Sequence, residues 1–189
     1  MIYDYFKVFF DILISILLFF LLLPVFLLVS ILIRIESPGS VFFYHERIGR
    51  NQKTFLCIKF RTMYKNSEKS GKFWTDPNDD RITKVGYYLR KYSIDELPQL
   101  INVIKNEISL VGPRPDHILQ KSDYKEYEIN KRCSVKPGIT GLSQVSGRSN
   151  LTFEQRKKFD LEYVDNYSFL LDIKILFKTF LQLFKGNSF

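Results

Sequence analysis

Cysteine is scarce in this chain, and the two cysteines that it has are far apart. Cys57 and Cys133 form no CxxC pair and no cluster with histidine among the 189 residues. Their placement argues against a disulfide framework and a structural zinc site, and it favours a reducing cytoplasm. Internal repeats and low-complexity segments are also absent. The length therefore indicates one soluble domain plus one apolar membrane element.

Nucleotide-binding and nucleic-acid-binding signatures are missing as well. The sequence has no P-loop and no glycine-rich nucleotide loop, which argues against an ATP-dependent lipid kinase or a membrane-anchored phosphatase. It has no RNP, helix-turn-helix or zinc-finger pattern. What it has in excess is positive charge: 28 Lys and Arg against 20 Asp and Glu, a net charge of +8 and a pI of about 9.4. This charge favours anionic partners, namely nucleic acid, anionic lipid head groups or phosphorylated small molecules.

One long apolar run stands near the N-terminus. About 20 apolar residues suffice for a helix to span a bilayer, and residues 8–33 are apolar except for Asp11, Ser15, Pro24 and Ser30. A charged stretch, residues 34–39, follows in place of the small-residue cleavage site of a signal peptide. The run therefore predicts a membrane anchor, either one straight span or a bent helix.

Features inside and beside the run bear on its topology. A charge such as Asp11 costs roughly 2.5–3.5 kcal/mol within a membrane, and Pro24 removes a helical hydrogen bond and kinks the chain. Lys7 and Arg34 flank the run, and the positive-inside rule places both on the cytoplasmic side. A re-entrant helix bent at Pro24 meets that demand and keeps Lys7 and Asp11 near the head groups. On these residues alone, the re-entrant hairpin and the straight span are equally favoured.

The remainder of the chain alternates short strands with short helices. In residues 54–63 the alternation places Lys59 and Arg61 on one face of a strand, with Ile58 and Phe60 on the other. Hydrophobic periodicity and turn residues predict strands at 40–49, 54–63 and 109–111, helices at 85–91, 97–106, much of 116–133 and 152–166, and loops at 64–80 and 135–142.

The C-terminal segment is apolar again. Residues 169–184 are rich in Phe, Leu and Ile, with Lys174 and Lys178 spaced along them. A core helix and an interfacial amphipathic helix both fit this pattern. We favour the interfacial helix, because a small domain hardly needs another apolar helix for its core.

Two adjacent carboxylates, Asp95 and Glu96, stand where a helix is predicted to begin. Ser93-x-x-Glu96 matches a capping box, in which Asp95 is an ordinary first-turn acid. A helix N-terminus also lowers the pKa of a carboxylate and attracts phosphate. Such a carboxylate can attack phosphorus or ligate Mg²⁺. Taken alone, the string favours the capping box; its surroundings favour chemistry on a phosphorylated substrate.

Those surroundings are basic. Four arginines each lie beside a rigid or glycine-rich element, where their guanidinium groups are suited to bidentate phosphate binding: Arg61, Arg90, Arg114 and Arg148.

At this point the chain resembles the bacterial sugar transferase family, the monotopic phosphoglycosyl transferases. The matching blocks come in the family's order and cover nearly the whole sequence: residues 42–49, 59–63, 80–86, 89–100, 109–115, 136–141 and 147–148. The chain is similar to a minimal member with one membrane helix and a catalytic domain.

The resemblance implies an α+β monotopic membrane protein. Residues 1–36 would form the re-entrant, Pro-kinked hairpin, with Ser15 and Pro24 at the family's Ser/Pro break. Residues 37–189 would form a small, mostly helical catalytic domain with short strands and amphipathic interfacial helices. The expected location is the cytoplasmic face of the bacterial inner membrane. The resemblance thus shifts the balance toward the hairpin.

The resemblance also implies a reaction. Asp95 would attack the β-phosphorus of a UDP-sugar, release UMP and hold the sugar phosphate covalently until undecaprenyl phosphate takes it. Glu96 is the partner acid, Mg²⁺ is expected at Asp95, and phosphate binding falls to Lys59, Arg61, Arg90, Arg114 and Arg148. This would be the first membrane step of polysaccharide or glycoconjugate biosynthesis.

The implied partners are the UDP-sugar, undecaprenyl phosphate and membrane phospholipids, without nucleic acid. An N-acetylated amino sugar is the donor that we expect, as is common among small members. Homo-oligomers and downstream glycosyltransferases are protein partners that the sequence leaves open. The alternative from another class is a membrane-tethered basic adaptor for anionic lipid or nucleic acid. The net charge fits it, although the charge is spread along the chain.

Overall fold

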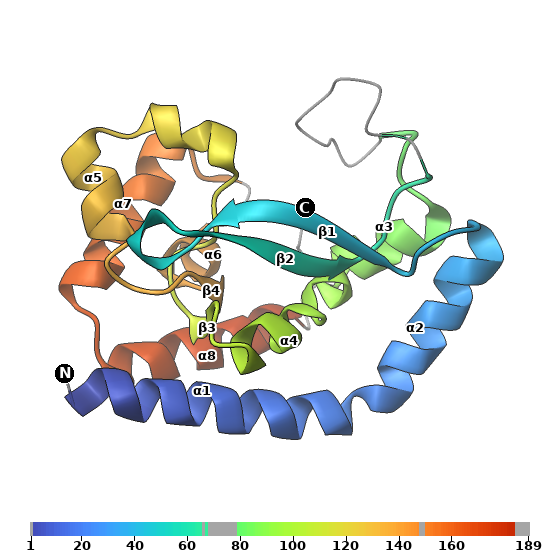
Figure 1. Ribbon diagram of the computed structural model, residues 1–189, viewed down its shortest axis with the longest axis horizontal. Helices are drawn as coiled ribbons and strands as arrows, with labels where there is room; N and C mark the ends of the chain where they lie inside the picture. The colour runs from blue at the N-terminus through green and yellow to red at the C-terminus, as the bar shows by residue number, and fades with distance from the viewer. Residues whose placement is uncertain (1, 66, 68–78, 148–149, 184–189) are drawn as a thin grey trace.

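A computed structural model describes residues 2–65, 67, 79–147 and 150–183 of the chain (Figure 1). The fold mixes helices and short strands, as the sequence predicted. In chain order the elements are α1 (Ile2–Leu21), α2 (Leu23–Glu36), β1 (Phe42–Ile48), the 3₁₀ turn η1 (Arg50–Gln52), β2 (Thr54–Phe60), α3 (Lys84–Lys91), the 3₁₀ turn η3 (Ile94–Glu96), α4 (Gln99–Ile104), β3 (Ser109–Val111), the 3₁₀ turn η4 (Ile118–Asp123), α5 (Glu126–Arg132), β4 (Gly138–Thr140), α6 (Leu142–Ser146), α7 (Phe153–Asp165) and α8 (Phe169–Leu183).

The N-terminal apolar run forms two helices that meet at Leu22 with a bend of 61°. Proline has no N–H, and its ring clashes with the carbonyl four residues earlier, so the break falls just before Pro24, which lies in the first turn of α2. Ser15 lies within α1 and not at the bend. Among the described helices, none alone is long and apolar enough to cross a membrane. The bent pair α1–α2 passes that test by length and composition.

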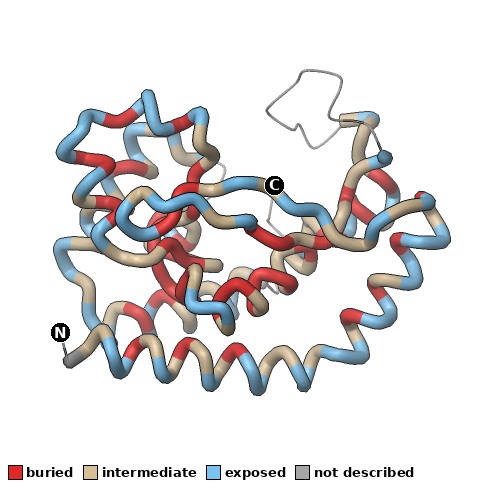
Figure 2. Tube along the Cα trace, viewed as in Figure 1, coloured by how far each residue is buried: buried red, intermediate tan, exposed pale blue. Residues whose placement is uncertain are grey.

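One side of α1 packs against the rest of the domain, as Figures 1 and 2 show. Lys7 and Asp11 lie on that side and are only 8% and 9% exposed. Lys7 Nζ is 2.5 Å from an oxygen of Asp172 on α8, and the Ser109 hydroxyl donates to Asp11 at 2.6 Å. The domain thus supplies partners for both charged groups, which makes their burial tolerable. That Lys7 and Asp11 also lie near the head groups stays a prediction.

Two small sheets frame the centre. β1 and β2 form an antiparallel hairpin, with Phe42 opposite Phe60 and Phe43 opposite Lys59. β3 and β4 pair in parallel, although β4 lies in a segment that the sequence predicted as a loop. A Cβ on Gly138 would lie 2.1 Å from the backbone nitrogen of Gly112, so glycine is required where these strands approach.

Of the three hydrophobic clusters in the described residues, two hold the bent helix pair to the rest of the domain. The larger joins α4, β3, α6, α7 and α8 through Leu100, Val103, Ile108, Leu110, Val111, Val145, Tyr163 and Ile175. The smaller packs α2 against β2 and α3 through Phe26, Val29, Ile33, Phe60 and Leu89. The bent helix pair is thus part of the domain's packing and not a separate appendage.

Helix ends follow local sequence signals to different degrees. α7 begins where predicted, because the Thr152 hydroxyl accepts from the backbone N–H of Gln155. α3 receives a cap from outside its own segment. Both carboxylate oxygens of Glu36, the last residue of α2, accept from the backbone N–H groups of Lys84 and Val85 at 2.7 and 2.8 Å. The bent pair α1–α2 and α3 are therefore connected directly.

Candidate active site

Asp95 and Glu96 lie in η3, the short turn between α3 and α4. Ser93, just before it, adopts a left-handed conformation with φ 55° that turns the chain after α3. Its side chain caps no backbone N–H of this turn, and the Glu96 carboxylate is bonded elsewhere. The capping-box interpretation is therefore wrong, and α4 begins only at Gln99. Both carboxylates remain near a helix start, held by the turn.

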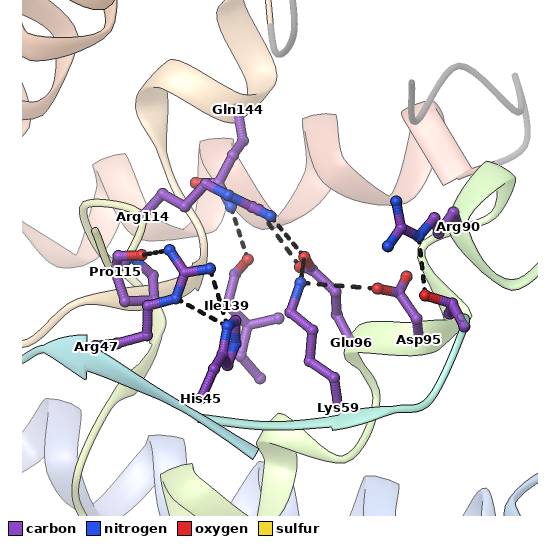
Figure 3. Close-up of polar contacts among 11 residues, drawn as sticks. His45, Arg47, Lys59, Arg90, Asp95, Glu96, Arg114, Pro115, Ile139 and Gln144 are labelled. Atoms are coloured by element: carbon purple, nitrogen blue, oxygen red, sulfur yellow. Dashed lines mark hydrogen bonds and ion pairs between the residues drawn. The ribbon is translucent and has the colours of Figure 1, made fainter. Parts of the chain in front are cut away.

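Glu96 is held by two cations (Figure 3). Lys59 Nζ donates to Oε1 at 2.6 Å, and the Arg114 guanidinium donates to Oε1 at 2.7 Å and to Oε2 at 3.5 Å. Burial by itself would raise the pKa of Glu96, but the ion pairs with Arg114 and Lys59 outweigh it and bring the pKa well below its usual range. Glu96 is therefore a fixed anion.

Asp95 has a different environment. It is only 8% exposed, and among the described residues its carboxylate has one ion pair, with Lys59 Nζ at 3.7 Å from Oδ2. Burial, the largest influence, raises the pKa of Asp95; Lys59 opposes this, and the Glu96 charge adds to it. Neighbouring carboxylates with pKa values displaced in opposite directions are typical of acids with different roles. The carboxylate oxygens of Asp95 can therefore contact a further cation or an electrophilic atom of a substrate.

Arginines lie on both sides of the pair in Figure 3. Arg90 on α3 lies beside Asp95, and its Nε donates to the Thr62 hydroxyl at 2.9 Å. Arg114 lies on the other side, in the turn after β3. The guanidinium of Arg132, which is 3% exposed, donates to the backbone carbonyl of Arg114 at 2.5 Å. Both arginines are therefore positioned by neighbouring groups.

The sequence of this site and its surroundings has close relatives. The pattern of the family described as bacterial sugar transferase matches residues 2–186. The chain belongs to the bacterial sugar transferase family.

Three relatives show how much of this chain, and how much of each relative, the sequence similarity spans. The exopolysaccharide production protein ExoY of Sinorhizobium fredii is 43% identical over 188 residues, which cover 90% of this chain and 81% of the relative. The undecaprenyl-phosphate galactose phosphotransferase of Salmonella typhimurium is 41% identical, over 90% of this chain and 38% of the relative. The UDP-glucose:undecaprenyl-phosphate glucose-1-phosphate transferase of Escherichia coli is 39% identical, over 93% and 39%. The chain thus spans less than half the length of the last two.

One basic residue predicted for the bacterial sugar transferase site, Arg61, has contacts elsewhere. The Arg61 guanidinium donates to the backbone carbonyls of Ser37 and Pro38, where the chain leaves α2. These contacts hold the linker between α2 and β1. The structure therefore does not bring Arg61 to the acids as predicted. Arg148 lies outside the described residues.

Sequence reasoning missed a pair of residues on β1. Arg47 donates to His45 Nδ1 at 3.2 Å from Nε and 3.0 Å from NH2, and to the Pro115 carbonyl at 3.3 Å. Burial, then the charges of Arg47 and Lys59, lower the pKa of His45 to about 3, so the imidazole is neutral. The sequence pattern could have shown this pair. His45 and Arg47 are two residues apart in β1, so their side chains lie on the same face of the sheet as Lys59.

A resident metal centre made by protein ligands alone does not fit the described part of this sugar transferase. Within it, no three His, Cys, Asp or Glu side chains lie close enough to hold an ion. Mg²⁺, however, is commonly bound by one or two carboxylates together with substrate phosphates. Asp95 fits that pattern because its carboxylate, unlike that of Glu96, has a cation no nearer than 3.7 Å.

Proposed function

We propose that this chain transfers a sugar 1-phosphate from a UDP-sugar to undecaprenyl phosphate and releases UMP. Membership of the family makes it a transferase, and the relatives' names supply the donor and acceptor classes. One observation supports the mechanism: a buried carboxylate, Asp95, whose ion pair with Lys59 is long at 3.7 Å, beside Glu96, whose carboxylate is neutralised by Lys59 and Arg114.

The reaction has two displacements on one phosphorus atom. An oxygen of the Asp95 carboxylate attacks the β-phosphorus of the UDP-sugar; the bond from that phosphorus to the bridging oxygen breaks, and UMP leaves with the electron pair. An oxygen of undecaprenyl phosphate then attacks the same phosphorus. The acyl-phosphate bond breaks, and the free Asp95 carboxylate returns as the undecaprenyl-diphosphate sugar forms.

The remaining side chains position phosphate and neutralise charge. Arg90 is beside the nucleophile, where it can hold an oxygen of the transferred phosphoryl group. Glu96 holds Lys59 and Arg114 in place through its ion pairs, so its role is positioning. Asp95 would hold Mg²⁺ together with substrate oxygens, and the bound ion would neutralise pyrophosphate charge.

The apolar surface fits an acceptor that stays in lipid. Large hydrophobic side chains are exposed along the outer sides of three helices: Phe9, Leu13, Leu17, Phe20 and Leu21 on α1, Leu27, Leu28, Ile31 and Ile35 on α2, and Leu170, Ile173, Phe177 and Phe180 on α8. Soluble monomers rarely expose that much apolar surface. We propose that α1 and α2 form a re-entrant hairpin in the cytoplasmic leaflet of the inner membrane, with α8 at the interface.

Topology can be tested at the N-terminus. Cys57 and Cys133 are buried, so a new cysteine at position 2 gives a specific reporter. A membrane-impermeant thiol reagent should label it in inside-out vesicles and not in intact cells whose outer membrane has been permeabilised. Labelling from the periplasmic side would defeat the hairpin.

UMP release from a panel of UDP-sugars, with and without undecaprenyl phosphate, tests the reaction. The panel includes UDP-glucose, UDP-galactose and UDP-N-acetylgalactosamine, the donors in relatives' names, and other N-acetylated amino sugars. We expect UMP from one donor class, foremost an N-acetylated one, and an adduct absent from Asp95→Asn. Charge-dependent RNA binding without UMP would instead support the adaptor.

A further inference from the structure

The start of α3 approaches the end of β2 more closely than any side chain on the helix would allow. A Cβ on Gly86 would lie 2.1 Å from the carbonyl oxygen of Thr62. The backbone N–H of Thr83 donates to that same oxygen at 3.0 Å, and the Thr83 hydroxyl caps α3 by accepting from Gly86 N–H at 2.8 Å. The position of Thr62 relative to α3 is therefore closely fixed.

Arg90 lies one helical turn after Gly86, so both face Thr62. Thr62 is only 7% exposed, and its hydroxyl oxygen accepts from Arg90 Nε at 2.9 Å. A guanidinium has five N–H donors in a rigid plane, so fixing Nε also sets the direction of the two terminal nitrogens. In Figure 3 this guanidinium lies beside the carboxylate of Asp95.

We propose that Thr62 is a positioning residue for phosphate binding by Arg90. Its hydroxyl holds the guanidinium in the orientation that meets the donor's phosphate while Asp95 attacks. Thr62 itself does not contact substrate; it acts through Arg90. This inference rests on the proposed phosphotransfer, and it assigns a role to a side chain that the chemistry does not otherwise use.

A matched pair of substitutions tests the hydroxyl. Thr62→Val keeps the shape and removes the acceptor, whereas Thr62→Ser keeps the acceptor. Losing one hydrogen bond to a charged group should lower kcat/KM for UMP release about 10-fold to 100-fold in Thr62→Val, and Thr62→Ser should retain most of it. Thr179→Val on α8, whose hydroxyl bonds Thr140 and the Ile175 carbonyl, makes the same chemical change elsewhere and controls for its general effect.

A double-mutant cycle separates positioning from general stability. Arg90→Lys keeps a positive charge but has no Nε–H for Thr62, so adding Thr62→Val to it should lower kcat/KM by less than about 3-fold. The inference is overturned if Thr62→Val alone retains wild-type kcat/KM. It is also overturned if the effect of Thr62→Val is as large in the Arg90→Lys variant as in the wild-type chain.

The hydrogen bond also has a readout that needs no turnover. In protein labelled with ¹⁵N-arginine, the Arg90 Nε–H signal should exchange slowly with solvent in wild type and Thr62→Ser, and rapidly in Thr62→Val. Equal exchange in all three overturns the inference, whatever the enzyme's activity. Absence of UMP release by wild type with every UDP-sugar contradicts the proposed function instead, so the two failures are distinguishable.

Discussion

Two groups of buried acids in this molecule are built from the same kinds of residues but differ in how fully they are paired. Around Arg132 the pairing is complete. Its guanidinium contacts Asp160 at 2.9 Å and Asp116 at 3.1 Å, while the Ser143 and Tyr124 hydroxyls donate to the same two carboxylates. Asp160 is 0% exposed. Such a cluster joins α5, α6, α7 and the turn after β3, and it serves structure.

Around Lys59 the pairing is uneven. Glu96 has two close cations, whereas Asp95, its neighbour in the chain, has its nearest cation at 3.7 Å. Buried carboxylates are normally matched by donors, and one that is not calls for an explanation. The comparison teaches that incomplete pairing, and not the presence of buried charge, marks the group available for chemistry.

The largest expected effect comes from removing the incompletely paired acid. Asp95→Asn should lower UMP release by at least about 1,000-fold, because the amide cannot act as the nucleophile. Stability should not fall. A pKa raised on folding means that ionised Asp95 disfavours the folded state above its unfolded pKa, and the neutral amide removes that penalty. Measuring UMP release and thermal melting on the same preparation of Asp95→Asn checks the activity and the stability predictions. UMP release at the wild-type rate would refute the assignment of Asp95 as the nucleophile.

Removing a member of the completely paired cluster should act on stability. Asp160→Asn leaves Arg132 with one carboxylate, and breaking a buried ion pair costs roughly 3–5 kcal/mol. Urea unfolding in detergent, followed by far-UV circular dichroism, measures the change. A decrease in the free energy of unfolding of less than about 1 kcal/mol would show that the ion pairs of this cluster are not needed for stability.

Glu96 should show an intermediate response. Glu96→Gln keeps the shape but removes the charge that holds Lys59 and Arg114, so kcat/KM should fall about 10-fold to 100-fold. Steady-state kinetics over a range of donor concentrations give kcat/KM and separate the two acids. A loss as large as that of Asp95→Asn would mean that Glu96 takes part in bond making.

The smallest effect is expected at a solvent-exposed pair. Lys131 and Asp165 are 2.6 Å apart, with side chains 40% and 57% exposed. Water and salt screen such pairs, so Asp165→Asn should change stability by about 0–1 kcal/mol and leave kcat/KM unaltered. The same unfolding and kinetic measurements check this prediction. A larger loss of stability would show that the short distance between the two charges matters more than their exposure to solvent.

Local signals in the sequence predicted much of the fold. The strands β1 and β2 and the helices α3 and α7 were predicted near their true positions, because alternation and the Thr152 cap are local features. β4 was missed because three residues form a strand only by pairing with β3, which is distant in sequence. The bend at Leu22 was placed at Pro24 because proline acts on the turn before it.

For the site, the sequence predicted which residue types take part better than it predicted where their side chains lie. Asp95 and Glu96 were found from their types and surroundings, and Lys59, Arg90 and Arg114 do gather around them. The roles assigned to these residues remain predictions. Periodicity alone placed Arg61 with Lys59, but periodicity does not tell where a long side chain reaches once the strand has ended. The partners of Lys7 and Asp11 depend on α1 packing against β3 and α8, a contact across the whole chain length.

Glu36 has a practical consequence for shortening this enzyme. A chain shortened to begin after residue 36 would leave the first N–H groups of α3 without their acceptor and Asp172 without Lys7. It would also expose Phe60 and Leu89, which α2 covers. Replacing the outward-facing leucines and phenylalanines of α1 and α2 with polar residues, while retaining Glu36 and Lys7, reduces the exposed apolar surface without these losses.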